Sequence, residues 1–189
     1  MSELNPMVAK FGLKEVEYRK LDELLAYEQP TKYIVNSTAY SEDYKVPVLT
    51  AGDSFILGYT DETAGVYKAS KEKPVIIFDD FTTSFHWVDF PFKVKSSAMK
   101  MLRPKDCKDV DFRYAYHCMR NLKIDLDGHR RRWIREYSQI EIPLPPLPVQ
   151  QQIVSILDSF TELTAELTAE LTSRKKQYEF YREKLLTFK

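Results

Sequence analysis

The sequence predicts an α+β domain, with an antiparallel or barrel-like sheet, followed by one long C-terminal helix. Short runs of β-branched and aromatic residues fill the first three quarters of the chain, a proline-rich junction follows, and after Pro148 neither Gly nor Pro occurs. Since Gly and Pro are the main helix breakers, the last part can form one uninterrupted helix. We therefore divide the chain into a lead-in segment (1–15), a globular domain (16–147) and a helix (148–189).

Six short runs have the alternation or the composition of β-strands. They are Val16–Leu21, Lys32–Val35, Phe55–Leu57, Val75–Phe78, Phe92–Lys95 and Ile140–Ile142. Turn-rich segments around Gly52, Gly58 and Gly65 separate them at loop spacing, which favours antiparallel pairing. One helix is expected among the strands, at Phe112–Leu122, because apolar residues recur there every three or four positions.

The junction holds four prolines between positions 143 and 148. Proline fixes φ and donates no hydrogen bond, so this stretch is predicted to be a stiff, extended connector. Pro148 suits the first turn of a helix, where its missing N–H has no intrahelical partner.

The helix would be on the order of 60 Å long at 1.5 Å per residue. Its bulky residues recur at alternating spacings of three and four, with Arg174 and Tyr181 completing the repeat and one extra spacing of four, a stutter, between Leu167 and Leu171. This heptad seam predicts a coiled coil; a helix folded back onto its own domain is the alternative. The expected dimerisation residues are Ile153, Ile156, Phe160, Leu163, Leu167, Leu171, Tyr178 and Leu185.

Composition limits the classes of function. Acidic and basic residues balance at 28 each, so the net charge gives no global attraction for nucleic acid. Any binding to DNA must then depend on the local distribution of charge. Cys107 and Cys118 have no metal-ligand spacing, so we expect no metal site and a reduced, cytoplasmic protein. The longest apolar run, Val75–Phe78, is too short to cross a membrane, and the N-terminus lacks the pattern of a signal peptide.

An arginine-rich segment is the sharpest local signal for nucleic acid. His129, Arg130, Arg131 and Arg132 are followed by Trp133 and Arg135, with no acid among them. Like charges that are clustered repel one another unless a polyanion is near, which favours contact with DNA phosphates or bases. A solvated charged face is the alternative.

A second candidate surface is the segment 82–87, which is rich in hydrogen-bonding and aromatic side chains. We expect Phe85 and Trp87 to fill the core, while the polar residues read base edges. Lysines near position 70 suit phosphate contact better than base reading. The additional candidate DNA-binding residues are therefore Thr82, Thr83, Ser84, His86, Lys68, Lys71 and Lys73.

Motifs for catalysis are weak. The chain has no Gly-x-Gly loop for a nucleotide or methyl donor and no Asn/Asp-Pro-Pro-Tyr/Phe motif. Asp43–Lys45 and Asp106–Lys108 match only the tail of a nuclease motif. Asp79 and Asp80 are paired carboxylates that suit a metal or acid–base site, but acids that hold the loop at Thr82 are the favoured interpretation.

Three segments carry a family resemblance: the proline-rich strand end Ile142–Leu147, the following Gln151–Asp158, and Arg174–Arg182 near the end of the helix. Together with Tyr27–Tyr33 and Ile77–Trp87, they resemble the specificity (S) subunit of type I restriction–modification systems. Many members carry an acid before the glutamine pair, where this chain has Val149 and Gln150. Typical members also carry two recognition domains and two helices, so the chain resembles half an S subunit.

This resemblance implies a non-catalytic subunit that reads a half-site in double-stranded DNA and positions methyltransferase (M) and restriction (R) subunits. S-adenosylmethionine, ATP and Mg²⁺ would then belong to those partners, and the chain itself would need no cofactor. The residues leave two other classes of function open. They are a coiled-coil adaptor that binds only protein, and a standalone DNA-modifying enzyme with a degenerate motif.

Overall fold

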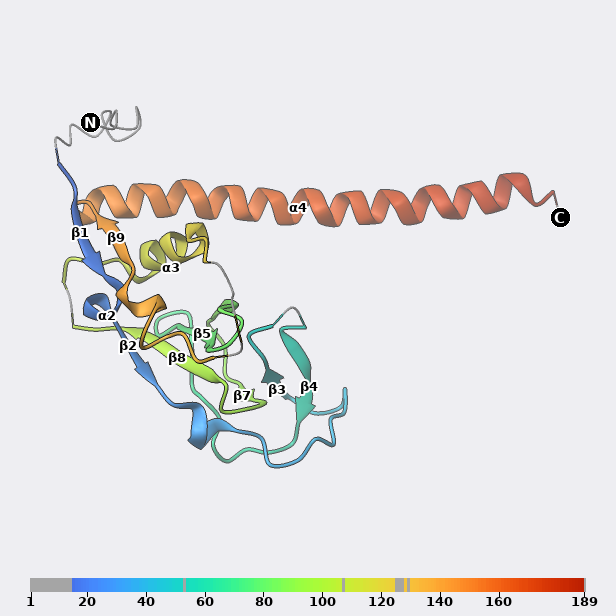
Figure 1. Ribbon diagram of the computed structural model, residues 1–189. Coiled ribbons are helices and arrows are strands. Elements are labelled where there is room, and N and C mark those ends of the chain that lie inside the picture. Colours follow the sequence, from blue (N-terminus) through green and yellow to red (C-terminus); the bar gives the residue numbers. More distant parts are fainter. Residues whose placement is uncertain (1–14, 53, 107, 125–127, 129, 189) are drawn as a thin grey trace.

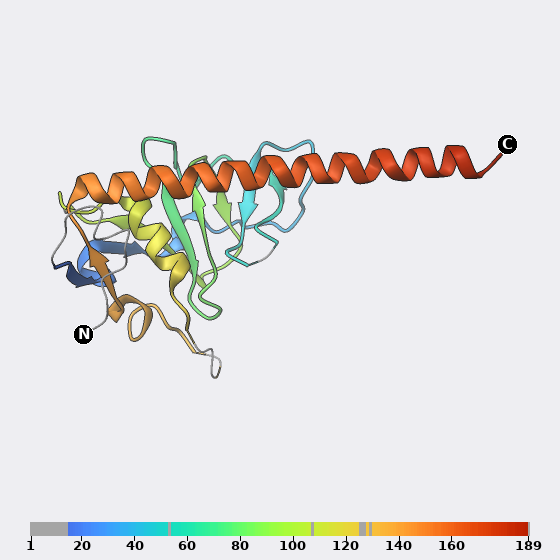
Figure 2. The same ribbon diagram turned by 90° about the horizontal axis from the view of Figure 1, so that it is seen from above.

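The computed structural model describes residues 15–188, except for 53, 107, 125–127 and 129. It is a mixed domain of antiparallel sheets and short helices, followed by one long helix, which confirms the predicted fold class. The domain lies along the first half of the long helix, and the second half extends beyond it (Figures 1 and 2).

Short strands and helices alternate along the domain before the long helix begins. In chain order, the elements are β1 (Glu17–Lys20), α2 (Leu21–Leu24), β2 (Leu25–Glu28), the 3₁₀ helix η1 (Pro30–Tyr33), β3 (Val46–Leu49), β4 (Ile56–Thr60), β5 (Val75–Asp79), β6 (Phe85–Val88), β7 (Lys93–Val94), β8 (Met99–Pro104), α3 (Phe112–Asn121), the 3₁₀ helix η2 (Tyr137–Gln139), β9 (Glu141–Leu144) and α4 (Leu147–Leu186).

These strands form three sheets. A four-stranded sheet has the order β2-β8-β5-β6, a three-stranded sheet has the order β4-β3-β7, and β1 pairs with β9. The pairings between the named strands are antiparallel except for the one between β3 and β7. The pair β1–β9 joins the beginning of the described chain to the strand before the long helix.

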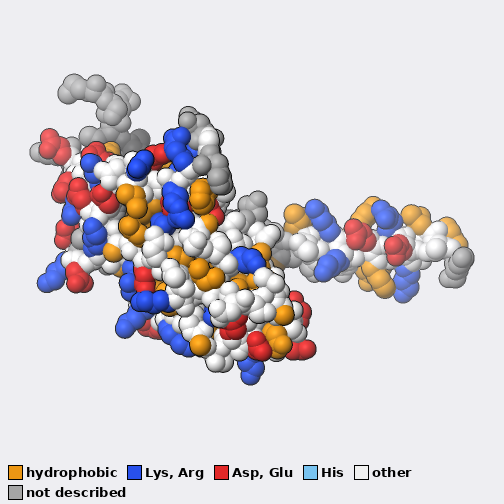
Figure 3. Space-filling view, turned by 60° about the horizontal axis from the view of Figure 1, so that its bottom comes forward, with side chains coloured by type: hydrophobic (Ala, Val, Ile, Leu, Met, Phe, Trp, Pro, Cys, Tyr) orange, Lys and Arg blue, Asp and Glu red, His pale blue; other side chains and the backbone are white. Residues whose placement is uncertain are grey.

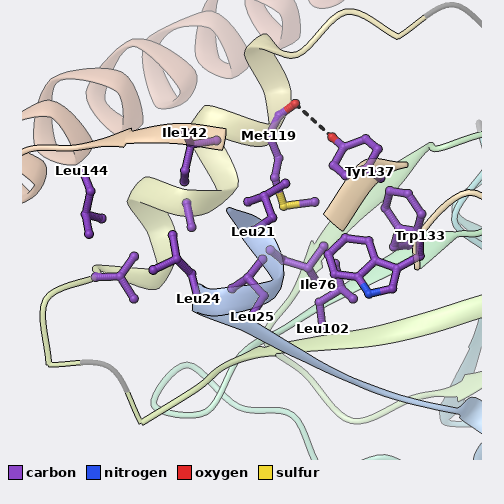
Figure 4. Packing of buried hydrophobic residues seen from close by; sticks show 13 residues of the cluster. Leu21, Leu24, Leu25, Ile76, Leu102, Met119, Trp133, Tyr137, Ile142 and Leu144 are labelled. Carbon is purple, nitrogen blue, oxygen red and sulfur yellow. Dashed lines mark hydrogen bonds between the residues drawn. The ribbon is translucent and has the colours of Figure 1, made fainter. Parts of the chain in front are cut away.

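Two hydrophobic cores share the central strand β5. Successive side chains of a strand point to opposite faces, so Ile76 and Phe78 enter one core with α2 and α3, whereas Val75 and Ile77 enter the other with the three-stranded sheet. All four side chains are fully buried. Figure 4 shows the first core, where the hydroxyl of Tyr137 donates a hydrogen bond to the carbonyl of Met119 at 3.2 Å.

The structure corrects the prediction of a strand at Lys32–Val35. Residues 30–33 form the 3₁₀ helix η1, and only a bridge between Ile34 and Val94 follows it. Pro30 at the start of η1 fixes φ in the helical range, so a 3₁₀ helix forms here although β-branched residues follow it. The other five expected strands correspond to β1, β4, β5, β7 and β9, with ends shifted by no more than three residues.

Four strands were not expected, namely β2, β3, β6 and β8. Phe85–Val88 is a strand paired with β5, so the loop ahead of it is limited to residues 80–84. In β8 the charged Lys100 interrupts the apolar pattern, although its side chain is 1% exposed. In β3, Pro47 interrupts the pattern.

The proline-rich junction is shorter than predicted. Pro143 and Leu144 pair with β1, so the extended connector consists only of Pro145 and Pro146. Pro148 lies in the first turn of α4, as expected. The helix then continues without interruption to Leu186, which confirms the prediction of one long helix.

Helix α4 contacts its own domain only near its beginning. Gln150 is fully buried, and from Ser159 onward every described residue of the helix is exposed. The helix is therefore not folded back along its length. The seam side chains from Ile156 onward are open to solvent in this single chain, for example Phe160 at 62% and Leu185 at 68% exposure.

Candidate nucleic-acid interface

The turn between β5 and β6 presents Thr82, Thr83 and Ser84. The Asp79 carboxylate accepts hydrogen bonds from the backbone N–H groups of Phe81 (2.9 Å) and Thr82 (2.8 Å). Thr83 has a φ of 59°, in the left-handed region, which a non-glycine residue adopts only when its surroundings hold it there. The side chain of Thr82 is exposed at the tip of the hairpin.

Asp80 fixes the arginine-rich segment beneath this turn. Its side chain is 2% exposed, and Oδ1 accepts hydrogen bonds from the backbone N–H groups of Arg132 (3.1 Å) and Trp133 (2.9 Å). Oδ2 lies 3.1 Å from Lys100 Nζ and 3.2 Å from Arg131 Nη1. The prediction that the paired acids hold the loop at Thr82 is therefore confirmed for Asp79, whereas Asp80 holds the arginine-rich segment instead.

The surroundings of Asp80 keep it ionised. Burial alone raises its pKa, but the hydrogen bonds from Trp133 N–H and Lys100, together with the charge of Lys100, hold the pKa below its usual value. A buried charge is tolerated when it is paired and hydrogen-bonded in this way. Asp80 thus has a structural role in the site, because donors from the chain itself already occupy its carboxylate oxygens.

The three arginines of the segment have different surroundings. Arg130 Nε lies 2.6 Å from Glu136 Oε1 and Arg131 lies over the ring of Phe81, and both side chains are about half exposed. Arg132 is 1% exposed, and it donates hydrogen bonds to Glu136 Oε2 (2.9 Å) and the Gly128 carbonyl (3.1 Å). The prediction that Arg132 contacts DNA is corrected, because its side chain is enclosed by the domain.

Acids from outside the segment offset part of its charge. Glu136 lies four residues after Arg132, and Asp80 directly follows strand β5, some fifty residues earlier in the sequence. Arg130, Arg131 and Arg135 are exposed and remain candidates for DNA contact. The fourth predicted residue of this cluster, His129, lies outside the described residues.

His86 has a different environment from the one expected for a base-reading residue. It lies within strand β6, its Nε2 is 3.0 Å from the Gly52 carbonyl, and its ring packs on Phe55 with centroids 4.5 Å apart. Since the carbonyl can only accept, Nε2 carries the proton of this hydrogen bond. The contact joins β6 to the turn between β3 and β4. Phe85 and Trp87 pack against the first core, as predicted.

The structure places the three predicted DNA-binding lysines away from the turn between β5 and β6. Lys68, Lys71 and Lys73 are exposed on the segment that leads into the beginning of β5, whereas Thr82 follows its end. A five-residue strand separates these points by roughly 16 Å at 3.3 Å per residue. Figure 3 shows Lys and Arg side chains spread over the visible face with acids between them, without a single basic patch.

A hollow of about 670 Å³ lies beside the hairpin, between it and the end of α3. Its wall includes Thr83 and His86 from the hairpin and two basic residues, Arg120 and Lys123, from the end of α3 and just beyond it. Both basic side chains are exposed. Sequence reasoning missed these two residues, although two basic residues ending an amphipathic helix were visible in the sequence. The hairpin, Arg120, Lys123, Arg130 and Arg131 form what we call the hairpin face.

A cluster of contacts fixes α4 to this domain. Asp158 of α4 accepts hydrogen bonds from Arg113 Nε (3.0 Å) and lies 2.8 Å from His117 Nε2, both from α3. The Arg113 guanidinium also lies over the rings of Trp87 and Tyr116, at 4.7 and 4.8 Å. Burial raises the pKa of Asp158, but the hydrogen bonds from Arg113 and His117 lower it more, so the pKa lies below its usual value.

Gln150 completes this attachment. Its Oε1 accepts from the Asp111 N–H (2.8 Å), and its Nε2 donates to the carbonyls of Asp109 and Pro145 (2.7 Å each). Asp111 in turn caps α3, accepting from the N–H groups of Arg113 and Tyr114. One buried amide therefore joins the connector, the cap of α3 and the first turn of α4.

Residues 13–174 match the family model described as the type I restriction modification DNA specificity domain. The chain belongs to this family. It is 52% identical to the EcoR124I/EcoR124II specificity subunit of Escherichia coli, over 100% of this chain and 49% of that protein. A putative type I restriction enzyme specificity subunit from Haemophilus influenzae is 35% identical, over 92% of this chain and 46% of its own length. The chain thus spans about half the length of the curated relatives it matches.

Solved structures of specificity subunits share the fold. The S subunit from M. genitalium superposes with a TM-score of 0.65 at 17% identity, over 92% of this chain and 46% of that one. The HsdS subunit from Thermoanaerobacter tengcongensis gives a TM-score of 0.52 at 15% identity, over 83% and 40%. The resemblance to specificity subunits is therefore confirmed, and these matches do not support the alternative of a coiled-coil adaptor.

The described residues show neither a metal site nor a membrane-spanning helix. No set of three or more His, Cys, Asp or Glu side chains in this part of the specificity domain is placed to hold a metal ion. Within the same residues, no helix has the length and apolar character needed to cross a membrane.

Proposed function

We propose that this chain is a non-catalytic DNA-recognition module that reads one half-site of a bipartite sequence. The match of residues 13–174 to the DNA specificity domain family carries the proposal. The hairpin face supports it, because it offers the hydroxyl groups of the turn, two further basic side chains that border the same hollow, and two exposed arginines in the segment that Asp80 holds. Such a set provides both base and phosphate contacts.

The partners follow from the family. The chain docks a methyltransferase (M) subunit and a restriction (R) subunit in the cytoplasm, and these partners bind S-adenosylmethionine, ATP and Mg²⁺. The zero net charge of the chain supports this division, since strong DNA binding then needs charge from a partner. DNA affinity of the chain alone is weak and strongly salt-dependent.

Helix α4 sets the distance between two half-sites. The seam residues of α4 are exposed in the single chain and form an apolar stripe that a second helix covers. Two copies of the chain paired through α4 present the same domain to each half-site, so the recognised sequence is palindromic and bipartite. The two-residue connector and the buried Gln150 leave little freedom between domain and helix.

Mapping of methylated adenines tests this function. The chain is expressed with its M subunit in a host that lacks other adenine methylation, and the methylated sites are sequenced. We expect one palindromic, bipartite motif, with altered half-site bases when Thr82, Thr83 and Ser84 are replaced together by Ala. A motif that does not depend on this chain, or one unchanged by the triple replacement, contradicts the assignment of base reading to the hairpin face.

A further inference from the structure

The tip of the β5–β6 hairpin (residues 81–84) uses all four of its backbone N–H groups within the turn. The N–H groups of Phe81 and Thr82 donate to the Asp79 carboxylate at 2.9 and 2.8 Å. That of Thr83 donates to the Asp79 carbonyl at 3.0 Å, and that of Ser84 donates to Thr82 Oγ1 at 3.4 Å. The backbone of the tip therefore keeps no donor for DNA.

Two carbonyls of the same tip stay open. In the part of the chain that the structure describes, the carbonyls of Thr82 and Thr83 accept no hydrogen bond. The Ser84 carbonyl, in contrast, accepts from the Asp79 N–H at 2.8 Å. A carbonyl oxygen only accepts hydrogen bonds, so the backbone of the tip offers acceptors to a ligand and no donors.

The side chains of the tip add little donor capacity. Thr82 Oγ1 donates to Ser84 Oγ at 3.0 Å, which leaves the hydroxyl groups of Thr83 and Ser84 as the side-chain donors. Each hydroxyl group also accepts hydrogen bonds. The Asp79 carboxylate that holds the turn carries a negative charge. Acceptors therefore outnumber donors at the tip.

This arrangement is unsuited to phosphate. Turns and helix N-termini that bind phosphate present free backbone N–H groups to it, whereas those of this tip are already used. Phosphate oxygens are themselves acceptors with negative charge, so the open carbonyls and Asp79 repel them. The cations of the hairpin face come from neighbouring segments, as Arg120, Lys123 and Arg131 show. Phosphate contact thus belongs to those side chains, and the tip is left for the bases.

Only some base edges present a donor to an acceptor-rich tip. In the major groove the donors are the exocyclic amino groups of adenine and cytosine, whereas guanine and thymine present acceptors there. In the minor groove the donor is the amino group of guanine. The major groove is the wider one and admits a two-stranded β-ribbon. The β5–β6 tip therefore matches the amino group of an adenine or a cytosine.

We propose that this tip recognises the exocyclic amino group of one adenine or cytosine in its half-site, through the carbonyls of Thr82 and Thr83. Asp79 is the positioning residue, because its carboxylate holds the N–H groups of Phe81 and Thr82 within the turn. The inference rests on the proposed function and adds the chemical group that is read. A complex that methylates a motif dependent on this chain, but tolerates the loss of every amino group, leaves the function standing and removes the inference.

Base analogues that lack the amino group test this recognition. The complex of the chain with its M subunit is titrated, by fluorescence anisotropy, with duplexes that carry the mapped motif and one replaced base each. Purine replaces adenine, 2-pyrimidinone replaces cytosine, and hypoxanthine replaces guanine. We expect affinity to fall about tenfold or more at one adenine or cytosine, because the carbonyls lose their donor. If only hypoxanthine has an effect, or if no analogue has one, the inference is wrong.

Variants at Asp79 identify which amino group the tip reads. Asp79→Ala frees two backbone N–H groups, so removal of that amino group should lower the affinity of this variant less than about twofold. Asp79→Asn keeps an oxygen that accepts the same hydrogen bonds, and the tenfold effect should persist. An amino group read elsewhere in the complex gives the same loss in the parent and in both variants. If this holds for every amino group in the motif, the tip reads none of them.

Two further variants cover the stability of the turn. Thr83→Gly keeps the left-handed backbone and both carbonyls, so the amino-group effect should remain. Its loss in this variant overturns the assignment to the carbonyls. If urea denaturation shows that Asp79→Ala is unfolded, Thr82→Val takes its place, since it frees the Ser84 N–H and leaves Asp79 intact. An amino-group effect that Thr82→Val leaves unchanged at every position contradicts the inference.

Discussion

Arg131 Nη1 lies 3.2 Å from Asp80 Oδ2, which joins the arginine segment to the end of the central strand β5. The same carboxylate holds the backbone of the next two residues, while Glu136 pairs with Arg130 and Arg132, so this buried acid and Glu136 together position the segment. The hairpin face is thus built from parts far apart in the sequence, and its geometry depends on a residue that points away from solvent.

Replacement of this acid should destabilise the domain. Asp80→Asn leaves Lys100 buried without its anion, and we expect the free energy of unfolding to fall by about 3 kcal/mol. Urea denaturation measures the change. Asp43→Asn, at an exposed site, should have little effect. Adding Lys100→Met to Asp80→Asn should recover part of the loss, and an equally unstable double variant argues against the unpaired lysine as the cause.

The arginines of the segment should separate into two classes. Replacing Arg130 and Arg131 with Ala removes exposed cations, so in complex with the M subunit we expect DNA affinity to fall by roughly 2 kcal/mol and the salt slope by about 2. Replacing the buried Arg132 should instead lower the free energy of unfolding. Anisotropy titrations at several salt concentrations, together with urea denaturation, distinguish these effects. Equal DNA affinity of the double variant and the parent assigns Arg130 and Arg131 to a solvated face.

The attachment of α4 should depend on Gln150. Gln150→Ala removes three hydrogen bonds and leaves their partners unsatisfied, so we expect a loss of about 3 kcal/mol in the free energy of unfolding. The neighbouring Gln151 is exposed, and Gln151→Ala should change stability by less than about 0.5 kcal/mol. Similar losses for both variants contradict the role assigned to the buried amide.

Glu62 should contribute to stability in a pH-dependent way. Hydrogen bonds from Lys93 and from the backbone of Ser37 and Asn36 lower its pKa from 4.5 to about 2. A carboxyl whose pKa is lower in the folded state stabilises the fold above its unfolded pKa, and the contribution is lost as the pH falls from 4.5 toward 2. Denaturation at pH 7 and pH 3 should show a smaller pH effect in Glu62→Gln than in the parent. Glu42→Gln, at an exposed site, is the control, and equal pH effects in the parent and in Glu62→Gln contradict the prediction.

The length of α4 should set the gap between half-sites. Inserting one more Glu-Leu-Thr-Ala unit after Ala169 extends the existing repeat and lengthens the helix by about 6 Å. In the methylated-adenine map, we expect a changed gap and unchanged half-site bases. If the half-site bases change while the gap stays the same, the assignment of base recognition to the domain and of the gap to α4 is wrong.

The sequence predicted the parts whose pattern is local. Val75–Phe78 is a continuous β-branched and aromatic run, and the absence of Gly and Pro after Pro148 marks the long helix. Strand β8 was missed because Lys100 looks like a surface residue, and only its contact with Asp80 allows it to be buried. Burial of polar side chains depends on partners that are distant in the sequence.

Prediction of the candidate site from the sequence was limited in the same way. Clustering of arginines was visible, but the burial of Arg132 follows from Glu136 and from the path of the chain past Asp80. The hydroxyl-rich turn was recognised, whereas His86 is occupied by the Gly52 carbonyl, which a linear pattern does not reveal. Arg120 and Lys123 join the site only because α3 ends beside the hairpin.

The contacts of Arg113 couple the long helix α4 mechanically to the hairpin formed by β5 and β6. Asp158 belongs to α4, Arg113 to α3 and Trp87 to β6, so three side chains in direct contact join the helix to the strand behind the hairpin tip. A force that tilts the free end of α4 is therefore transmitted to the hairpin without passing through a loop. In the proposed complex, an M subunit that binds α4 would thereby orient the hairpin on its half-site, and loss of the Arg113 contacts would make that orientation less defined without changing any side chain of the hairpin.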